Sequence, residues 1–213
     1  DERVLRFRCA QNDTLGLDAV FDRDLPLDRS SIAGYVVTEG MPLNIEDAYH
    51  LPPAPFTFNR SFDRDSGYRT RSMLTVPLRD PSGQTLGAVQ LINRRRPEGV
   101  TAFSAHDEAL ATGLAGAAAI ALVNTRLNAE IERVFEGFVR AAVYAVDARD
   151  PTTAGHSLRV AKLSTGLGRV ALEAGLPDVG ALARPDGLRR LEFAALLHDF
   201  GKIGVAEDVL LKA

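Results

Sequence analysis

The chain has 213 residues, of which 46% are hydrophobic and 25% are charged, with a formal net charge of −3. This composition is typical of a soluble globular protein, and the charge offers no basic surface for a nucleic-acid polymer or an anionic membrane. A single cysteine, Cys9, rules out an intrachain disulfide and fits a reducing compartment, so we expect a cytoplasmic protein. The longest apolar run, which begins at Gly113, is shorter than the about 20 residues of a membrane-spanning helix.

The first half of the sequence predicts strands and turns. "RVLRFRCA" near the start alternates apolar residues with arginines, as a half-exposed strand does. Two β-rich runs, residues 73–78 and 86–92, flank the turn-forming "RDPSGQ" and predict a hairpin whose second strand is central in a sheet. Residues 47–70 show neither a helical nor a strand period, which predicts a long ordered loop of functional importance.

The second half predicts helices. Ser104 is a candidate N-cap, and apolar residues then recur at intervals of three or four from Ile120 to Ala145. Such a stripe is typical of a coiled-coil connector or of a core helix, and we favour a connector with a second domain starting near Ile131. Pro151 is expected to end this helix. A further helix should run from His156 to about residue 174, and a last one should be closed by Gly201.

The stretch "LLHDFGKIGV" places His198 beside Asp199 on a predicted helix that is followed by a glycine and Lys202. An imidazole and a carboxylate suit Fe, Mn or Zn, and the carboxylate of Asp199 can bridge two ions. Lys202 would then face an anionic substrate. In the alternative interpretation the histidine only forms a hydrogen bond with Asp199, and Lys202 only stabilises the end of the helix.

A second motif lies about forty residues upstream of the histidine–aspartate pair. "DARDPTTAGHSLRVAKLS" followed by "LLHDFGKIGVAEDVLLK" resembles the first part of an HD-GYP domain, a phosphodiesterase of bacterial cyclic di-GMP signalling, over about residues 140–213. The resemblance implies that His156, His198 and Asp199 are metal ligands and that Lys202 is a catalytic contact to the substrate phosphate. Thr152 stands where some members carry a glutamate for a third metal, which favours a centre of two divalent ions, Fe or Mn.

The sequence also departs from this family. It contains no Gly-Tyr-Pro motif and none of the later ligands that follow it in the family. Three ligands do not fill the coordination spheres of two ions. We therefore expect the parent protein to hold two metals, and this chain to hold none or an incomplete set and to be inactive on cyclic di-GMP.

The region from Asp1 to about Leu127 resembles a different family. "SIAGYVVTEGMPLNIEDAY", "FDRDSGYRTRSMLTVPL" and "LGAVQLINR" are similar to GAF domains, in particular to the cyclic-nucleotide-binding GAF domains of phosphodiesterases. Their signature has its counterpart at Asn93, Arg94, Phe103, Asp107 and Glu108, with arginine in place of lysine. Arg94 and Asp107 can form an ion pair that locks a loop to a helix.

The GAF resemblance also implies a small-molecule pocket. By position, its contacts would come from Ile32, Ala33, Asp63, Ser66, Thr70 and Gln90. A carboxylate, hydroxyls and an amide suit a nucleotide, and free backbone N–H groups at a helix start suit a phosphate. The alternative is an unliganded GAF domain that serves dimerisation alone.

Together these resemblances predict an α+β GAF domain at residues 1–127, lacking its first elements, joined by a long helix to an all-α, truncated HD portion at residues 128–213. We expect a homodimer through the connector helix, with a small molecule bound to the sensor and cyclic di-GMP as the substrate of the parent. The alternatives are a dimeric ligand-binding module with a degenerate, non-catalytic HD domain, and a general HD-superfamily nucleotide hydrolase.

Overall fold

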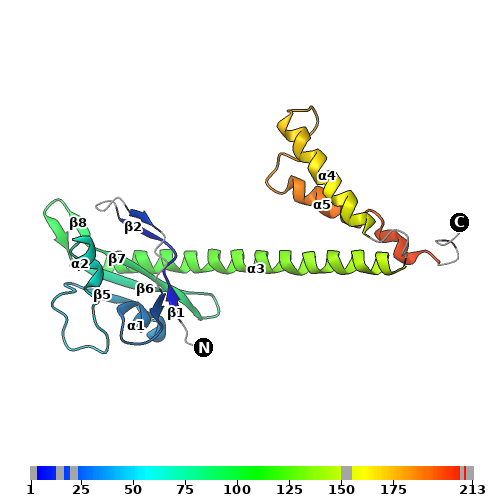
Figure 1. The fold of residues 1–213 in the computed structure, drawn as a ribbon. Helices are drawn as coiled ribbons and strands as arrows, with labels where there is room; N and C mark the ends of the chain where they lie inside the picture. The colour runs from blue at the N-terminus through cyan, green and yellow to red at the C-terminus, as the bar shows by residue number, and fades with distance from the viewer. Residues whose placement is uncertain (1–3, 13–16, 20–23, 150–154, 207–208, 210–213) are drawn as a thin grey trace. The chain divides into compact units, whose positions relative to one another are not determined.

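The computed structural model describes residues 4–12, 17–19, 24–149, 155–206 and 209. The chain divides into two compact units, Asp1–Arg126 and Leu127–Ala213, here named the sheet unit and the helical unit. The long helix α3 (Ala105–Arg149) contributes its first part to the sheet unit and the remainder to the helical unit (Figure 1).

The sheet unit is built around an antiparallel sheet of three strands: β5 (Leu43–Ile45), β6 (Met73–Arg79) and β7 (Thr85–Ile92). The predicted hairpin is confirmed, because β6 and β7 pair antiparallel across a turn at residues 80–84. The prediction that the second strand of this hairpin is central was wrong. The order β5-β6-β7 places β6 in the middle, and residues 72–77 are all buried.

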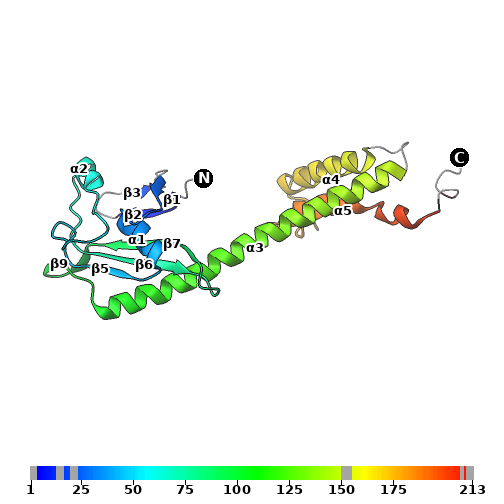
Figure 2. The ribbon, with the colours of Figure 1, turned by 90° about the horizontal axis from the view of Figure 1, so that it is seen from below.

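Both faces of β6 are covered, because successive side chains of a strand point to opposite sides. On one face Met73 packs in a cluster with Ile32 of helix α1 (Ile32–Glu39). On the other face Leu74 packs in a cluster with Ala111 and Ala115 of α3. Figure 2 shows α1 and the start of α3 on opposite sides of these strands. The expected α+β architecture, an antiparallel sheet flanked by helices, is therefore confirmed for this unit.

Shorter elements complete the sheet unit. Three two-stranded ladders pair β1 (Val4–Arg6) with β4 (Asp24–Pro26), β2 (Ala10–Asn12) with β3 (Leu17–Ala19), and β8 (Arg94–Arg96) with β9 (Gly99–Thr101). The region 47–70 was predicted to be a long ordered loop, but it is not a loop throughout. It contains helix α2 (Ser61–Ser66), a six-residue segment too short to show an apolar period.

The helical unit contains the end of α3, α4 (His156–Glu173), α5 (Gly187–Leu197) and a 3₁₀ helix at Phe200–Gly204. Helices α4 and α5 approach closely at Gly168, where an added Cβ would lie 3.0 Å from a methyl carbon of Leu191. The expected start of α4 is confirmed. Gly201 does not close α5, because that helix ends before His198 and the 3₁₀ helix continues past the glycine. Pro151 and Thr152 lie outside the described residues.

By length and composition alone, α3 is apolar enough over Ala105–Ala148 to cross a membrane. Its first part packs against the sheet through Ala111 and Ala115, beside Leu74 and Val76, which identifies that part as a core helix of the sheet unit. Ala119, one turn further along, is also fully buried.

Candidate functional site

The three predicted metal ligands meet in the helical unit. His156 is the first residue of α4, His198 caps the end of α5, and Asp199 follows it. One potential ligand atom from each residue lies within 4.8 Å of the others, and the two imidazole ring centres are 5.3 Å apart. Folding therefore brings together residues that are separated by about forty positions in the sequence.

The orientation of His198 is set by the backbone of α5. Its Nδ1 lies 2.8 Å from the carbonyl oxygen of Ala195. A carbonyl oxygen can only accept, so Nδ1 carries the proton and donates it, which turns Nε2 toward Oδ2 of Asp199 at 3.4 Å. An imidazole that is held by a backbone carbonyl and presents its other nitrogen beside a carboxylate is a common arrangement at metal sites.

Lys202 lies on the same side of the 3₁₀ helix as Asp199. Its Nζ donates a hydrogen bond of 2.7 Å to Oδ2 of Asp199. This ammonium group holds the pKa of the Asp199 carboxyl below its ordinary value. The carboxylate is therefore ionised and able to bind a cation, but one of its oxygens already has a positively charged partner. The predicted role of Lys202, contact with a substrate phosphate, would use another of the three N–H donors of its ammonium group.

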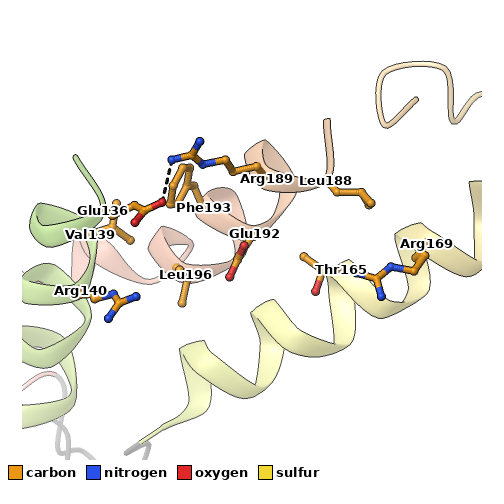
Figure 3. A pocket seen from close by; sticks show the side chains of 10 residues that line it. All are labelled: Glu136, Val139, Arg140, Thr165, Arg169, Leu188, Arg189, Glu192, Phe193 and Leu196. Carbon is orange, nitrogen blue, oxygen red and sulfur yellow. Dashed lines mark hydrogen bonds and ion pairs between the residues drawn. The ribbon is translucent and has the colours of Figure 1, made fainter. Parts of the chain in front are cut away.

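A cavity of about 530 Å³ opens between the helices of the helical unit. Figure 3 shows its ten lining residues: Glu136, Val139, Arg140, Thr165, Arg169, Leu188, Arg189, Glu192, Phe193 and Leu196. Arg189 is held by ion pairs with Glu132 and Glu136 at 3.0 and 2.8 Å. Arg140 of α3 and Arg169 of α4 lie on opposite sides of the cavity and give it two further cationic groups (Figure 3). The mixture of arginines and apolar walls suits an anionic group attached to a planar or apolar body.

In the sheet unit, the predicted pocket residues Asp63 and Thr70 bind each other. Asp63 is 5% exposed, and its Oδ1 accepts a hydrogen bond of 2.9 Å from the Thr70 hydroxyl. Its Oδ2 accepts from the backbone N–H of Thr70 at 2.7 Å and from the hydroxyl of Tyr49 at 2.9 Å. The Asp63 carboxylate thereby connects α2 to the segment that leads into β6. This contact stabilises the fold whether or not a ligand also binds there.

The other predicted pocket residues are also engaged within the unit. The side chain of Ile32 belongs to the core beneath α1, and Ala33 follows it in the first turn, where Ser31 accepts a hydrogen bond from Gly34. The hydroxyl of Ser66 donates to the carbonyl of Phe62 at 2.6 Å. The amide of Gln90 donates to Thr75 at 3.2 Å. These contacts place Gln90 on the face of the sheet that carries Met73 and α1.

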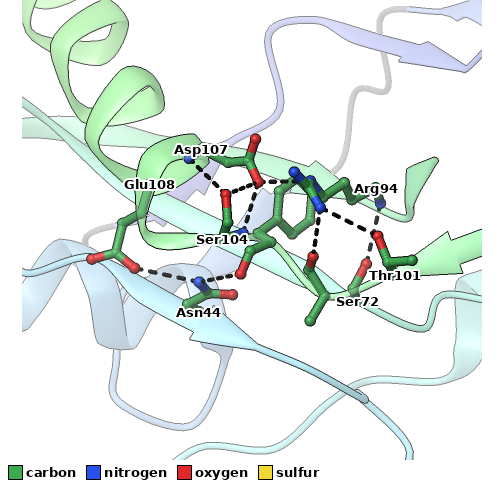
Figure 4. Close-up of polar contacts among 9 residues, drawn as sticks. Asn44, Ser72, Arg94, Thr101, Ser104, Asp107 and Glu108 are labelled. Carbon is green, nitrogen blue, oxygen red and sulfur yellow. Dashed lines mark hydrogen bonds and ion pairs between the residues drawn. The ribbon is translucent and has the colours of Figure 1, made fainter. Parts of the chain in front are cut away.

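The signature residues form a compact polar lock at the start of α3 (Figure 4). Arg94 Nε lies 2.6 Å from Asp107 Oδ2, so the expected ion pair is present. The same carboxylate oxygen accepts hydrogen bonds from the backbone N–H and the hydroxyl of Ser104. These hydrogen bonds and the positive charge of Arg94 hold the pKa of Asp107 below its ordinary value. Ser104 in return accepts from the N–H of Asp107, so its predicted N-cap role is confirmed.

The remaining signature residues extend this lock to neighbouring segments. Asn93 has a φ of 56°, and its side chain donates to the carbonyl of Arg69 and accepts from the N–H of Arg71, at 2.7 and 2.6 Å. Phe103 packs beneath α3, and its carbonyl accepts from Asn44, which also reaches Glu108 at 3.4 Å. The role of the signature residues in this structure is to join the end of β7 to the start of α3.

Sequence reasoning missed a cluster around Tyr49. The guanidinium groups of Arg60 and Arg69 lie 4.5 and 4.4 Å from the centre of the Tyr49 ring. The hydrogen bond from Tyr49 to the Asp63 carboxylate raises the pKa of the phenol. Only the richness of residues 47–70 in aromatic and charged side chains pointed toward such a cluster.

The comparison with known proteins agrees with the geometry of the sheet unit. A model of the GAF domain family matches residues 6–122, which is more than half of the chain, and the chain therefore belongs to the GAF domain family. A curated relative, the dual 3′,5′-cyclic-AMP and -GMP phosphodiesterase 11 of Drosophila melanogaster, is 37% identical over 98 residues. The alignment covers 46% of this chain and 6% of that protein, so the chain spans a small part of the relative's length.

Among solved structures, the type II free methionine-R-sulfoxide reductase from Thermoplasma acidophilum is similar over 45% of this chain and 57% of that one. The sequence identity is 21% and the TM-score is 0.34, which is too low to support an argument about function.

Proposed function

We propose that this chain is the sensor and the front part of the output domain of a cytoplasmic bacterial signalling phosphodiesterase. In this proposal the GAF domain binds a small molecule of the cyclic nucleotide class and controls an HD-GYP domain that hydrolyses cyclic di-GMP in the intact protein. The observation that supports the output function best is the convergence of His156, His198 and Asp199, whose ligand atoms lie within 4.8 Å of one another.

The three residues fit the chemistry of a divalent transition metal such as Fe or Mn. Two neutral imidazoles and an ionised carboxylate form a donor set of this class, and the two oxygens of Asp199 can be shared between neighbouring ions. Such ions, when bound, supply an activated water and stabilise the charge on a phosphodiester. Within the chain, His156 and His198 would hold them and Lys202 would turn toward the phosphate. Further ligands are needed to complete two coordination spheres, so we propose that the chain alone is inactive.

The proposal for the sensor rests on the GAF fold and on the similarity to a cyclic-nucleotide phosphodiesterase. The polar groups of Asp63, Thr70 and Gln90 suit the edge of a purine, and the start of α1 suits a phosphate. Asp63 already accepts three internal hydrogen bonds. Gln90, which is half-buried on the sheet, is therefore the more informative residue for a binding experiment.

Metal analysis tests the output function. We expect the intact protein to retain two ions of Mn or Fe per chain after dialysis. His198→Ala should weaken metal binding by more than the about 10–100-fold that is typical for the loss of an outer contact. His106→Ala, at an exposed histidine near the start of α3, is the matched control and should leave the metal content unchanged. An intact protein that binds no transition metal would contradict the proposal.

A second candidate function is a dimeric ligand-binding module whose HD portion acts only through protein contacts. The ion pair of 2.7 Å between Lys202 and Asp199 favours it, because this contact satisfies the carboxylate without a metal. The two candidates differ in Lys202→Met. If Asp199 is a metal ligand, this variant should keep its metal and lose phosphodiesterase activity in the intact protein. If the pair is only structural, the variant should lower the stability of the helical unit without any change in metal content.

The sensor ligand can be sought by calorimetric titration of the whole chain with cyclic AMP, cyclic GMP and cyclic di-GMP. We expect a purine cyclic mononucleotide to bind, and Gln90→Met to weaken this binding while the fold is kept. Gln84→Ala, in the exposed turn between β6 and β7, is the control. Wild-type chain that binds none of the three nucleotides would instead favour a GAF domain that serves dimerisation alone.

A further inference from the structure

The cavity of the helical unit has the size of a small-molecule site. Its volume of about 530 Å³ lies within the range of about 300–1,000 Å³ that is usual for ligand pockets. Its walls come from α3, α4 and α5 (Figure 3). None of the three candidate metal ligands lines this cavity, so a molecule bound in it would occupy a different place from the metal cluster.

One arginine of the cavity is already neutralised within the unit. Arg189 forms ion pairs with Glu132 and Glu136, and its guanidinium group lies 5.5 Å from the centre of the Phe193 ring. Arg189 and Phe193 therefore form a wall that is ordered by contacts within the protein. Binding to a wall that is already ordered costs less conformational entropy than binding to a mobile one.

Two further arginines of the cavity have no such contacts. Arg140 of α3 and Arg169 of α4 form no hydrogen bond or ion pair with any residue that the structure describes. Figure 3 shows them on opposite sides of the cavity. A ligand in the cavity would therefore lie between two guanidinium groups, whose N–H donors match the oxygens of a phosphate or a carboxylate.

The other polar groups that face the cavity are acceptors. Glu192 forms no hydrogen bond or ion pair with the described part of the chain. The Thr165 hydroxyl donates its proton to the carbonyl oxygen of Ala161 at 2.8 Å, so toward the cavity it can only accept. Apolar wall is supplied by Val139 and Leu196. The body of a matching ligand is therefore partly apolar and carries hydrogen-bond donors, as a nucleoside does.

We propose that this cavity binds a nucleoside monophosphate, with its phosphate held by Arg140 and Arg169 and its donors directed toward Glu192 and Thr165. A phosphate monoester carries nearly two negative charges at pH 7, which two guanidinium groups balance, whereas a carboxylate carries one. The carboxylate of Glu192 would repel further anionic groups, which favours a monophosphate over a polyphosphate.

A ligand in this cavity would also contact the turn of α5 that leads to the candidate metal cluster. Leu196 lines the cavity two residues before His198. The preceding residue, Ala195, supplies the carbonyl oxygen that orients the His198 ring. An occupied cavity would therefore hold this turn in place and stabilise the orientation of His198. This consequence rests on the proposed phosphodiesterase function, whereas the binding itself does not.

Isothermal titration of the whole chain with AMP, adenosine and inorganic phosphate tests the site. We expect AMP to bind, and adenosine and phosphate to bind at least about 10-fold more weakly, because each lacks part of the contacts. Arg140→Met and Arg169→Met should each weaken AMP binding about 10-fold or more through the loss of charge-assisted hydrogen bonds. Arg133→Met, at an exposed arginine of α3 outside the cavity, is the matched control and should leave the affinity unchanged. Equal affinities for AMP and inorganic phosphate, or equal effects of the three variants, would overturn the proposal.

Two further variants separate this cavity from the sensor and from unspecific attraction to surface charge. Thr165→Phe fills the cavity and keeps every arginine, so it should also weaken AMP binding about 10-fold or more, with circular dichroism to check the fold. Gln90→Met, in the sheet unit, should leave AMP binding unchanged. Binding that survives Thr165→Phe, or that is lost in Gln90→Met, would contradict the proposal. An intact protein that binds AMP in this way but holds no transition metal would refute the phosphodiesterase and support the nucleotide site.

Discussion

The sheet unit and the helical unit use apolar residues in different ways. In the sheet unit the strand β6 is buried on both faces, and its core residues Leu74 and Val76 have no exposed surface. In the helical unit α4 leaves several large apolar residues about 60–69% exposed: Leu158, Leu163, Leu167 and Val170. The sheet unit therefore has a core strand that is covered on both faces, whereas α4 of the helical unit presents apolar surface that the described residues do not cover.

The largest expected loss of stability in the sheet unit comes from Leu74→Ala. Removing this fully buried side chain from between β6 and α3 should lower the free energy of unfolding of the sheet unit by about 2–5 kcal/mol. Leu91→Ala is the control, because Leu91 pairs with Leu74 across the sheet but is 39% exposed. The free energies of unfolding of both variants are measured by chemical denaturation followed by circular dichroism, because the chain contains no tryptophan. Equal effects at the two positions would show that the buried face of β6 contributes no more to stability than the partly exposed Leu91.

A smaller effect is expected from Asp63→Asn. The buried carboxylate accepts three hydrogen bonds, from Tyr49 and from two groups of Thr70, and the neutral amide loses their charge-assisted strength. We expect a loss of about 1.5–3 kcal/mol in the free energy of unfolding. Asp65→Asn, at an exposed position of the same short helix, should change it little. If the two variants were equally stable, Asp63 would be free to serve a ligand rather than the fold.

The sequence predicted best what depends on neighbouring residues. The hairpin followed from two β-rich runs around a turn, and the cap at Ser104 followed from an acceptor side chain before a helix with acids in its first turn. The start of α4 at His156 followed in the same way from a turn before an amphipathic run. Each of these features is decided within a few residues of the chain, so local chemistry suffices to find it.

What the sequence did not predict depends on contacts between distant residues. β6 rather than β7 is central because β5, only three residues long, pairs with it. The hydrogen bonds that Asp63 forms with Tyr49 and Thr70 could not be read from their spacing, although Asp63 and Thr70 were both expected at the pocket. Periodicity likewise shows that a helix has an apolar face but not whether that face is covered.

The candidate metal cluster was predicted in part from the sequence. His156, His198 and Asp199 were singled out from a resemblance to a family, and the structure brings them within reach of one another. The turn of His198 toward Asp199 depends on the carbonyl of Ala195, which no sequence pattern reveals.

The smallest expected effect is on the melting temperature of the sheet unit and comes from a substitution of Asp107. Its pKa is held below the ordinary value of 3.8 by hydrogen bonds from Ser104 and by Arg94, so its ionised form stabilises the folded sheet unit. A carboxyl group with a lowered pKa contributes this stability above its unfolded pKa, and the contribution is lost as the pH falls through the folded pKa. Asp107→Asn should therefore lower the melting temperature by a few degrees at pH 7, and the difference from wild type should shrink below about pH 4.

The pH dependence of the difference in melting temperature shows whether Asp107 stabilises the start of α3 through its charge or only through hydrogen-bond geometry. The melting temperatures of wild type and Asp107→Asn are to be compared between pH 3 and pH 7, with Arg94→Lys as the matched variant on the other side of the pair. Lysine keeps the charge but lacks the planar fork of arginine, so Arg94→Lys should lower the melting temperature less than Asp107→Asn does. Because Asp107 lies in the first turn of α3, within the sheet unit, unfolding of the helical unit should be unchanged in both variants. A difference from wild type that stays constant down to pH 3 would mean that the carboxylate acts through hydrogen-bond geometry and not through its charge.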